Sequence, residues 1–275
     1  MDSLADPLRS LRTPDRRFYP ELDGLDRDAI YVDTFGGGAL YLAAHMARKM
    51  DLQPGEVVLD LGAGKGATSV FLAQRYGVQV VALDLWTPAD HLATRVAQLG
   101  LRDRILPLQM DATHPLPFAD GYFDAIFCQN SLNFYGGSVE FLHHLLRCLK
   151  PGGAFGVGME TLSAEFSPEE RENPPAVFNY NLPYPYEHIN TWVEDFSKMH
   201  SPGWWADLFR ASGLLDVLSC GEVEDADILY EDLIRYQMDH NLDPDDVAIS
   251  LKQLAWGRDH SPRKTLMVLQ ARKRR

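Results

Sequence analysis

The sequence lacks any long apolar run. No stretch approaches the roughly 18 uninterrupted apolar residues that a membrane-spanning helix needs, so no membrane contact is expected. The first twenty residues, MDSLADPLRSLRTPDRRFYP, contain no apolar core of the kind found in signal peptides. Cysteine is also scarce, with three residues and no CxxC pair, which is typical of free thiols in a reducing compartment. These absences together predict a cytoplasmic protein.

Positive charge is in short supply. The chain has 26 lysines and arginines against 39 acidic residues, a net charge of −13. Proteins that bind a polyanion normally present a basic face, so we expect no nucleic-acid partner. The terminal ARKRR is basic, but a charged chain end is usually solvated. No metal is expected either, because Glu140, His144 and Cys148 share i, i+4 spacing without any motif that supplies a fourth ligand.

Short apolar stretches alternate with amphipathic ones along most of the chain. Strands are expected at 56–61, 78–84, 104–109, 122–129, 154–160, 214–220 and 265–271. Helices are expected at 36–50, 68–75, 88–99, 138–149, 202–212, 226–240 and 244–256. This alternation predicts an α/β fold with a parallel sheet covered by helices on both faces.

Residues 161–200 break this rhythm with the stretch ENPPAVFNYNLPYP and many aromatic side chains. A long irregular segment in a compact domain is usually functional or disordered, and the aromatic content argues against disorder. We therefore expect residues 161–200 to form a lid, together with the N-terminal segment 1–35. Residues 36–160 would be the cofactor-binding core and residues 201–275 its C-terminal part.

A glycine-rich loop follows the first expected strand in VLDLGAGKGATSV. A phosphate-binding P-loop would need glycine where Leu59 stands and Ser or Thr where Gly66 stands, so that motif is excluded. A dinucleotide fingerprint, GxGxxG, fits only with Ala67 as its third small residue. The third alternative is an acid followed by three glycines at alternate positions: Asp60, Gly62, Gly64 and Gly66.

That third pattern resembles motif I of class I S-adenosylmethionine-dependent methyltransferases. Further segments follow in the family's order: ALDLW with Asp84, MDATHPLPF with Asp111, DGYFDAIFCQNSLNFY, and LLRCLKPGG. The resemblance covers about residues 36–160, and the combination with HSPGWW is similar to a bacterial small-molecule branch. It implies a Rossmann-like seven-stranded sheet, with the last strand antiparallel and a lid insertion after strand five. The implied cofactor is S-adenosylmethionine.

The resemblance also implies the reaction, which is methyl transfer to a small molecule by a monomer or homodimer. The aromatic insert favours an aromatic or partly apolar acceptor. Two alternatives stay open at this stage. One is a cofactor-binding protein without transferase activity, and the other is an NAD-dependent oxidoreductase.

Cofactor contacts are expected where the strands end. Asp60 would help to hold the cationic amino-acid head of the cofactor, Asp84 its ribose hydroxyls, and Asp111 the amino group of adenine. The full expected set is Asp60, Gly62, Gly64, Gly66, Thr68, Asp84, Leu85, Trp86, Asp111, Ala112, Gln129 and Asn130.

The catalytic base is not supplied by the family's usual position, because Asn133 replaces the histidine after strand four. His200 joins the aromatic insert to HSPGWW, and an unperturbed histidine titrates near neutrality. The candidates for catalysis are His200, Glu160 and Tyr186. The candidates for the acceptor pocket are Tyr31, Asn133, Tyr135, Tyr184 and Trp204.

Overall fold

The computed structural model describes residues 11–182, 187–242 and 244–275. Its sheet has the strand order β3-β2-β1-β4-β5-β7-β6. The strands are β1 (Val57–Leu61), β2 (Gln79–Asp84), β3 (Ile105–Gln109), β4 (Phe123–Gln129), β5 (Leu149–Leu162), β6 (Leu215–Glu222) and β7 (Lys264–Lys273). Neighbours from β3 to β5 pair in parallel, whereas β7 runs antiparallel to both β5 and β6. The expected seven-stranded sheet with an antiparallel last strand is confirmed.

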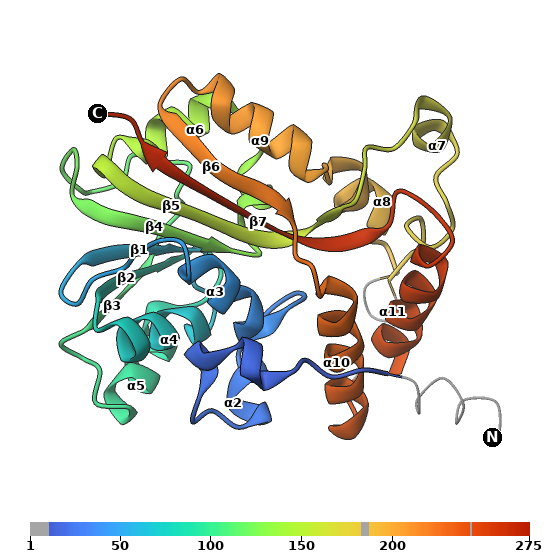
Figure 1. Ribbon diagram of the computed structural model, residues 1–275, viewed down its shortest axis with the longest axis horizontal. Helices are drawn as coiled ribbons and strands as arrows, with labels where there is room; N and C mark the ends of the chain where they lie inside the picture. The colour runs from blue at the N-terminus through green and yellow to red at the C-terminus, as the bar shows by residue number, and fades with distance from the viewer. Residues whose placement is uncertain (1–10, 183–186, 243) are drawn as a thin grey trace.

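Helices cover both faces of this sheet (Figure 1). One face carries α3 (Ala39–Ala47), α4 (Ala67–Tyr76) and α5 (Ala89–Gln98), and the other carries α6 (Val139–Leu146) and α9 (Pro202–Ala211). The remaining α-helices are α2 (Arg27–Tyr31), α7 (Pro168–Glu172), α8 (Thr191–Glu194), α10 (Ala226–Asp239) and α11 (Pro244–Gly257). Within the described ranges, no helix is long and apolar enough to cross a membrane.

The unbroken apolar run of β1 follows from this double cover. Successive residues of a strand point to opposite faces. Val58 accordingly packs in the core beneath α3 and α4, and Leu59 packs in the core on the α6 and α9 side. Both side chains are fully buried. A strand buried on both faces has no position for a polar side chain until its end, where the site residues appear.

Most expected elements differ by one or more residues at their ends, and two of these differences have a clear structural reason. The helix expected over 36–50 begins only at Ala39, because Gly36 and Gly38 both adopt left-handed backbone angles (φ 73° and 84°). The strand expected over 154–160 begins at Leu149, which pairs with Phe123 ahead of a register shift. The KPGG turn is therefore absorbed into β5 as an irregularity, which local turn propensity alone does not reveal.

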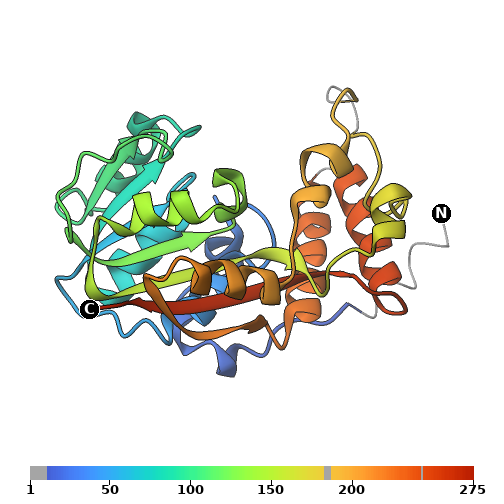
Figure 2. The ribbon, with the colours of Figure 1, turned by 90° about the horizontal axis from the view of Figure 1, so that it is seen from above.

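The aromatic insert forms a small core of its own. It follows β5 and carries α7 and α8, which lie with α10 and α11 at one end of the molecule (Figure 2). Phe178 is fully buried, and its ring lies 5.2 Å from that of Trp256 on α11. The buried members of this core are Leu162, Phe166, Phe178, Phe196 and Met199. Packing against one another and against α11 therefore accounts for much of the insert's aromatic content.

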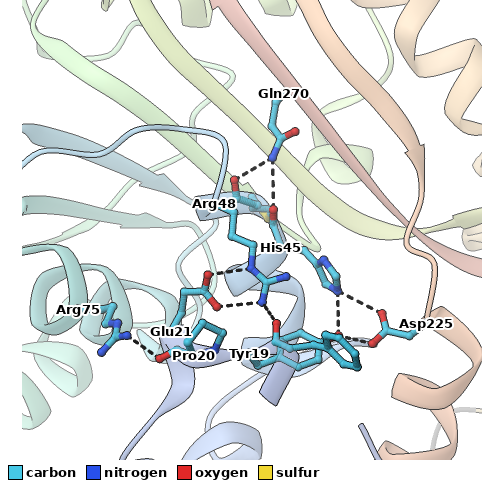
Figure 3. A network of polar contacts seen from close by, with 10 residues as sticks. Tyr19, Pro20, Glu21, His45, Arg48, Arg75, Asp225 and Gln270 are labelled. Atoms are coloured by element: carbon cyan, nitrogen blue, oxygen red, sulfur yellow. Dashed lines mark hydrogen bonds and ion pairs between the residues drawn. The ribbon is translucent and has the colours of Figure 1, made fainter. Parts of the chain in front are cut away.

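A polar network fixes the N-terminal segment to α3 and to the start of α10 (Figure 3). The buried Tyr19 donates its hydroxyl hydrogen to the carboxylate of Asp225, and the same hydroxyl lies 2.8 Å from His45 Nε2. Arg48 donates to Glu21 and lies over the Tyr19 ring, with 5.1 Å from its guanidinium carbon to the ring centroid. The bond between Tyr19 and Asp225 joins residues 206 positions apart in the chain.

We predict that Tyr19→Phe lowers the free energy of unfolding by about 1–3 kcal/mol, because it removes a hydrogen bond to a half-buried carboxylate. Burial opposes the ionisation of Asp225, but hydrogen bonds from His45 and Tyr19 outweigh it and keep its pKa below the usual value. This contribution is present above about pH 4, the unfolded-state pKa, and is lost as the pH falls through the lowered folded-state pKa.

Urea denaturation at pH 7 and at pH 3 measures both parts of this prediction. The matched control is Tyr122→Phe, since Tyr122 is 44% exposed. Equal stability of the two variants at pH 7 would contradict the prediction.

Candidate active site

A cavity of about 280 Å³ lies where β1, β2 and β4 end. The order of strands reverses at β1, because β2 lies on one side of it and β4 on the other. Loops that leave neighbouring strands on opposite faces diverge at such a point and leave a crevice. Seven of the expected cofactor residues line the cavity: Gly62, Gly64, Thr68, Asp84, Trp86, Gln129 and Asn130.

The glycine loop between β1 and α4 is shaped by its own neighbours. Gly62 has φ 74°, and a Cβ there would lie 2.3 Å from the Cβ of Ser131. Gly66 has φ 85°, and a Cβ there would lie 2.2 Å from a methyl carbon of Leu92. Left-handed angles and close neighbours both require glycine. Neighbouring side chains and backbone angles therefore fix the conformation of the loop without a ligand. Its backbone forms one wall of the cavity.

The carboxylate of Asp84 holds together the loop that follows β1 and the loop that follows β2. It accepts hydrogen bonds from the backbone N–H groups of Gly64 (2.8 Å), Trp86 (2.9 Å) and Thr87 (2.7 Å). A carboxylate offers about four acceptor positions, so one position is left for a further donor such as a hydroxyl group. The ribose contact expected for Asp84 is compatible with this arrangement.

Asp60 lies under the glycine loop and is 1% exposed. The hydroxyls of Thr68 and Ser69 donate to its Oδ2 at 2.6 and 2.5 Å, whereas its Oδ1 has no partner. Burial raises the pKa of Asp60 to about 6. A buried carboxylate with an unused oxygen is destabilising unless something else uses it.

A second unused acceptor belongs to Gln129, at the end of the neighbouring strand β4. Its Nε2 donates to the carbonyl of Ala39 at 2.9 Å, and its buried Oε1 has no partner. The crevice is thus lined by the Asp84 carboxylate and by the unpaired Oε1 of Gln129, and the unpaired Oδ1 of Asp60 lies buried beneath its glycine loop. This donor-poor set fits S-adenosylmethionine, which carries ribose hydroxyls and a cationic ammonium group.

Asn130 fixes the backbone of residues 35–37, which form a cover beside the cavity. Its backbone is left-handed (φ 50°), and its Nδ2 donates to the carbonyls of Phe35 (2.8 Å) and Gly37 (3.1 Å). Its Oδ1 accepts from the backbone N–H of Glu160. The Glu160 carboxylate in turn accepts from the Gly37 N–H (2.9 Å) and pairs with Lys264 (3.1 Å). Glu160 therefore supports the cover and does not itself line the cavity.

Sequence analysis missed part of the cavity wall. Ala63 and Ala67 stand within the glycine motif but were not expected to line the site, and the other missed residues share no motif: Asp33, Thr34, Phe35, Thr87 and Phe134. Three aromatic side chains of the wall are well exposed, namely Phe35 (58%), Trp86 (69%) and Phe134 (59%). A cluster of exposed rings at the mouth of a cavity is unusual for a soluble protein and indicates a binding surface. The signal available in the sequence was the aromatic Phe35 directly before the three glycines 36–38.

Several expected cofactor residues lie outside this cavity. The carboxylate of Asp111 accepts hydrogen bonds from the hydroxyl and the backbone N–H of Thr113, and these bonds lower the pKa of Asp111. Ala112 is fully buried, and Leu85 is 42% exposed beside Asp84. The cavity lining also omits Asp60 and Gly66, which act on it through the loop they support. Their cofactor contacts stay predictions.

The expected acceptor residues are dispersed. Tyr31 is buried and donates its hydroxyl to Asp232 at 2.6 Å. Tyr135 stacks on Phe141, with ring centroids 5.0 Å apart. Asn133 is half-buried on the loop that follows β4. Tyr184, like the catalytic candidate Tyr186, lies outside the described residues.

His200 lies in a separate polar cluster between the insert and α9. Its Nδ1 is 3.0 Å from Glu165 Oε2, and its ring stacks on Trp204 at 3.7 Å between centroids. Burial opposes the ionisation of Glu165, but hydrogen bonds from Ser201 and His200 outweigh it and lower its pKa. The histidine thus has a carboxylate on one ring nitrogen and a fixed ring plane. In the described part of the chain, no group of three or more His, Cys, Asp or Glu side chains could hold a metal ion.

Comparison with known proteins agrees with this geometry. The profile of a methyltransferase domain family matches residues 58–153. The demethylmenaquinone methyltransferase of Beutenbergia cavernae is 31% identical over 174 residues, which are 55% of this chain and 67% of that protein. The glycine/sarcosine/dimethylglycine N-methyltransferase of Actinopolyspora halophila is 25% identical over 146 residues, or 47% of this chain and 26% of that protein. The chain spans about a quarter to a half of the length of the first three curated relatives.

Solved structures show the same fold. A geranyl diphosphate C-methyltransferase from Streptomyces coelicolor superposes with a TM-score of 0.61 at 16% identity, covering 92% of this chain and 95% of that one. At 16% identity, this superposition supports a shared fold and nothing further. The sequence matches, the sheet order and the acceptor-rich crevice together lead to one conclusion: this chain belongs to the class I S-adenosylmethionine-dependent methyltransferases.

Proposed function

We propose that the protein transfers a methyl group from S-adenosylmethionine to a small-molecule acceptor. The observation that carries the proposal is the crevice, which is lined by the Asp84 carboxylate and by Gln129 with its unpaired Oε1, while the unpaired Oδ1 of Asp60 lies buried under its glycine loop. When bound, the cofactor supplies a methyl group activated by the positive charge on its sulfur. The chain supplies orientation, exclusion of water and a place for the proton that the acceptor loses.

An aromatic or partly apolar acceptor is the substrate class we propose. Trp86 and Phe134 meet edge to face, 5.2 Å apart, at the mouth of the cavity, and Phe35 is exposed beside them. Rings exposed around a cavity favour apolar and aromatic ligands. The aromatic side chains of the insert support this class less strongly, because they fill their own core.

We propose His200 as the general base, positioned by Glu165. The pairing of Nδ1 with the carboxylate leaves Nε2 to accept a proton. Its position after the insert also supports the proposal that residues 161–200 act as a lid, since lids bring groups to a site on closure. The backbone carbonyl of His200 accepts a hydrogen bond from the Thr161 hydroxyl, which joins the two ends of this segment.

The main experiment incubates the protein with methyl-labelled S-adenosylmethionine and a panel of hydroquinones, phenols and secondary amines, and identifies products by mass. A labelled product supports the proposal. Binding of S-adenosylhomocysteine without any product from the panel would favour a cofactor-binding protein without transferase activity. Competition of NAD for the same cavity would contradict the proposal.

We predict that Asp84→Asn weakens S-adenosylhomocysteine binding by about 10-fold to 100-fold, because a charge-assisted acceptor is lost. Asp90→Asn is the matched control, since Asp90 is exposed in the first turn of α5. Calorimetric titration measures the affinity. Unchanged affinity in folded Asp84→Asn would contradict the role of Asp84 in cofactor binding.

We predict that Asp60→Asn changes stability and binding in opposite directions. The folded-state pKa of Asp60, about 6, lies above the unfolded value, so the wild-type free energy of unfolding falls as the pH rises from about 4 to 6. The free energy of unfolding of the variant does not fall in this way. The difference in this free energy between the variant and the wild type should therefore grow in favour of the variant by on the order of 3 kcal/mol across that pH range.

Cofactor affinity should fall in the same variant, because the ammonium group loses a negative partner. Urea denaturation at pH 4 and pH 7 measures the first effect and calorimetry the second, with exposed Asp103→Asn as the control. A variant that is destabilised more at pH 7 than at pH 4 would refute the expectation.

We predict that His200→Gln lowers turnover at least about 100-fold, within the range for loss of a general base, and leaves S-adenosylhomocysteine affinity unchanged. Steady-state kinetics with an acceptor from the panel, recorded between pH 5 and 9, should lose the lower limb of the pH profile. His260→Gln is the control, because His260 also stacks on a tryptophan but lies outside this cluster. Full turnover in His200→Gln would contradict the role of His200 as the general base.

A further inference from the structure

A second cavity, of about 510 Å³, lies between the N-terminal segment, α3 and α10. It shares no lining residue with the candidate active site. In Figure 1 the N-terminal stretch runs past α10 toward α2 along this part of the molecule. We propose that this cavity binds an organic anion, a carboxylate or phosphate ester that carries an apolar body.

Three arginines line the cavity, and they differ in their partners. Arg27 is satisfied, because it pairs with Asp232 at 2.9 Å and with Asp239 at 2.7 Å. Arg16 and Arg235 have no carboxylate partner in the part of the chain that the structure describes. Among the described residues, Arg16 donates to the backbone carbonyls of Leu22 and Leu25 and interacts with the Tyr41 hydroxyl, and Arg235 donates to the carbonyl of Leu11.

The three arginines that line the cavity keep unused donor capacity. Their Nε atoms are all buried, and none has an acceptor among the described residues. Arginines outnumber aspartates in the cavity lining by three to two, in a protein of net charge −13. A guanidinium presents a rigid set of donors that matches carboxylate and phosphate geometry. An anion would therefore use donor capacity that the fold leaves unsatisfied.

The rest of the lining gives the ligand its apolar part. Leu11, Pro14 and Tyr41 are buried, and Met238 is half-buried beside them. The volume falls within the range of about 300–1,000 Å³ that is typical of small-molecule sites and is far larger than one phosphate group needs. The site thus favours a ligand with an anionic head and a hydrophobic or aromatic body over an inorganic ion.

Calorimetric titration of the full-length protein with phenyl phosphate and with benzoate tests the proposal. S-adenosylhomocysteine is present throughout, so that the candidate active site is filled. We expect saturable binding of at least one of the two anions, and their relative affinities distinguish phosphate from carboxylate recognition. Benzyl alcohol, which has the ring but no charge, should bind at least 10-fold more weakly.

The variants locate the binding. Arg16→Gln and Arg235→Gln should each weaken anion binding at least 10-fold and leave S-adenosylhomocysteine affinity unchanged. Arg17→Gln is the matched control, because Arg17 is exposed, pairs with Asp15 and lies outside the cavity. Thr13→Glu adds a carboxylate at an exposed position of the lining, so it should repel the anion even if the arginine variants fold poorly.

Three results would overturn the proposal. These are the absence of saturable anion binding, equal binding of benzyl alcohol, and anion binding that Thr13→Glu and the two arginine variants leave intact. None of them bears on methyl transfer, because the affinity for S-adenosylhomocysteine is measured independently.

Discussion

The parallel pairing of β1 with β2 on one side and β4 on the other is the constraint on which the site depends. The register places Asp60 of β1 beside Ala82 and Phe127, well inside the sheet. Because helices cover both faces, the parallel strands carry mostly apolar side chains along their length, and the buried Asp60 is an exception. The polar side chains that line the crevice stand at the strand ends, where Asp84 and Gln129 meet.

Within that crevice, burial and function pull in opposite directions. Asp60 is held in a place that raises its pKa, with one oxygen satisfied by two hydroxyls and the other by nothing. Stability alone would favour a neutral residue there. A cationic ligand group beside Asp60 would reverse the balance, because it would restore the interaction that the carboxylate loses on leaving water. The role proposed for Asp60 in cofactor binding would thus offset the cost of burying its charge.

The N-terminal segment connects the two cavities. Its Arg16 and Arg27 line the larger one, and Phe35, a few residues beyond the end of α2, lines the crevice. Asn130 and Glu160 hold the end of this segment in place by hydrogen bonds to its backbone. The same stretch of chain therefore closes the cofactor crevice and walls a basic cavity. The aromatic insert has a different character, since its core with α11 gives it internal order of its own.

The sequence by itself determined the fold class, the succession of strands and helices along the chain, and part of the wall of the crevice, because each is specified by local sequence. Apolar alternation specifies strands and helices, and the Asp60-to-Gly66 pattern specifies the loop, where the left-handed angles of the glycines leave little choice. Tertiary structure alone decided which distant groups meet. Asn130 holds the backbone of Phe35 beside the crevice by a hydrogen bond, and His200 pairs with Glu165. Arg16 and Arg235 line the same cavity although they are more than 200 positions apart in the chain. Such meetings depend on how packed elements are placed in space, and no local propensity or spacing encodes that placement.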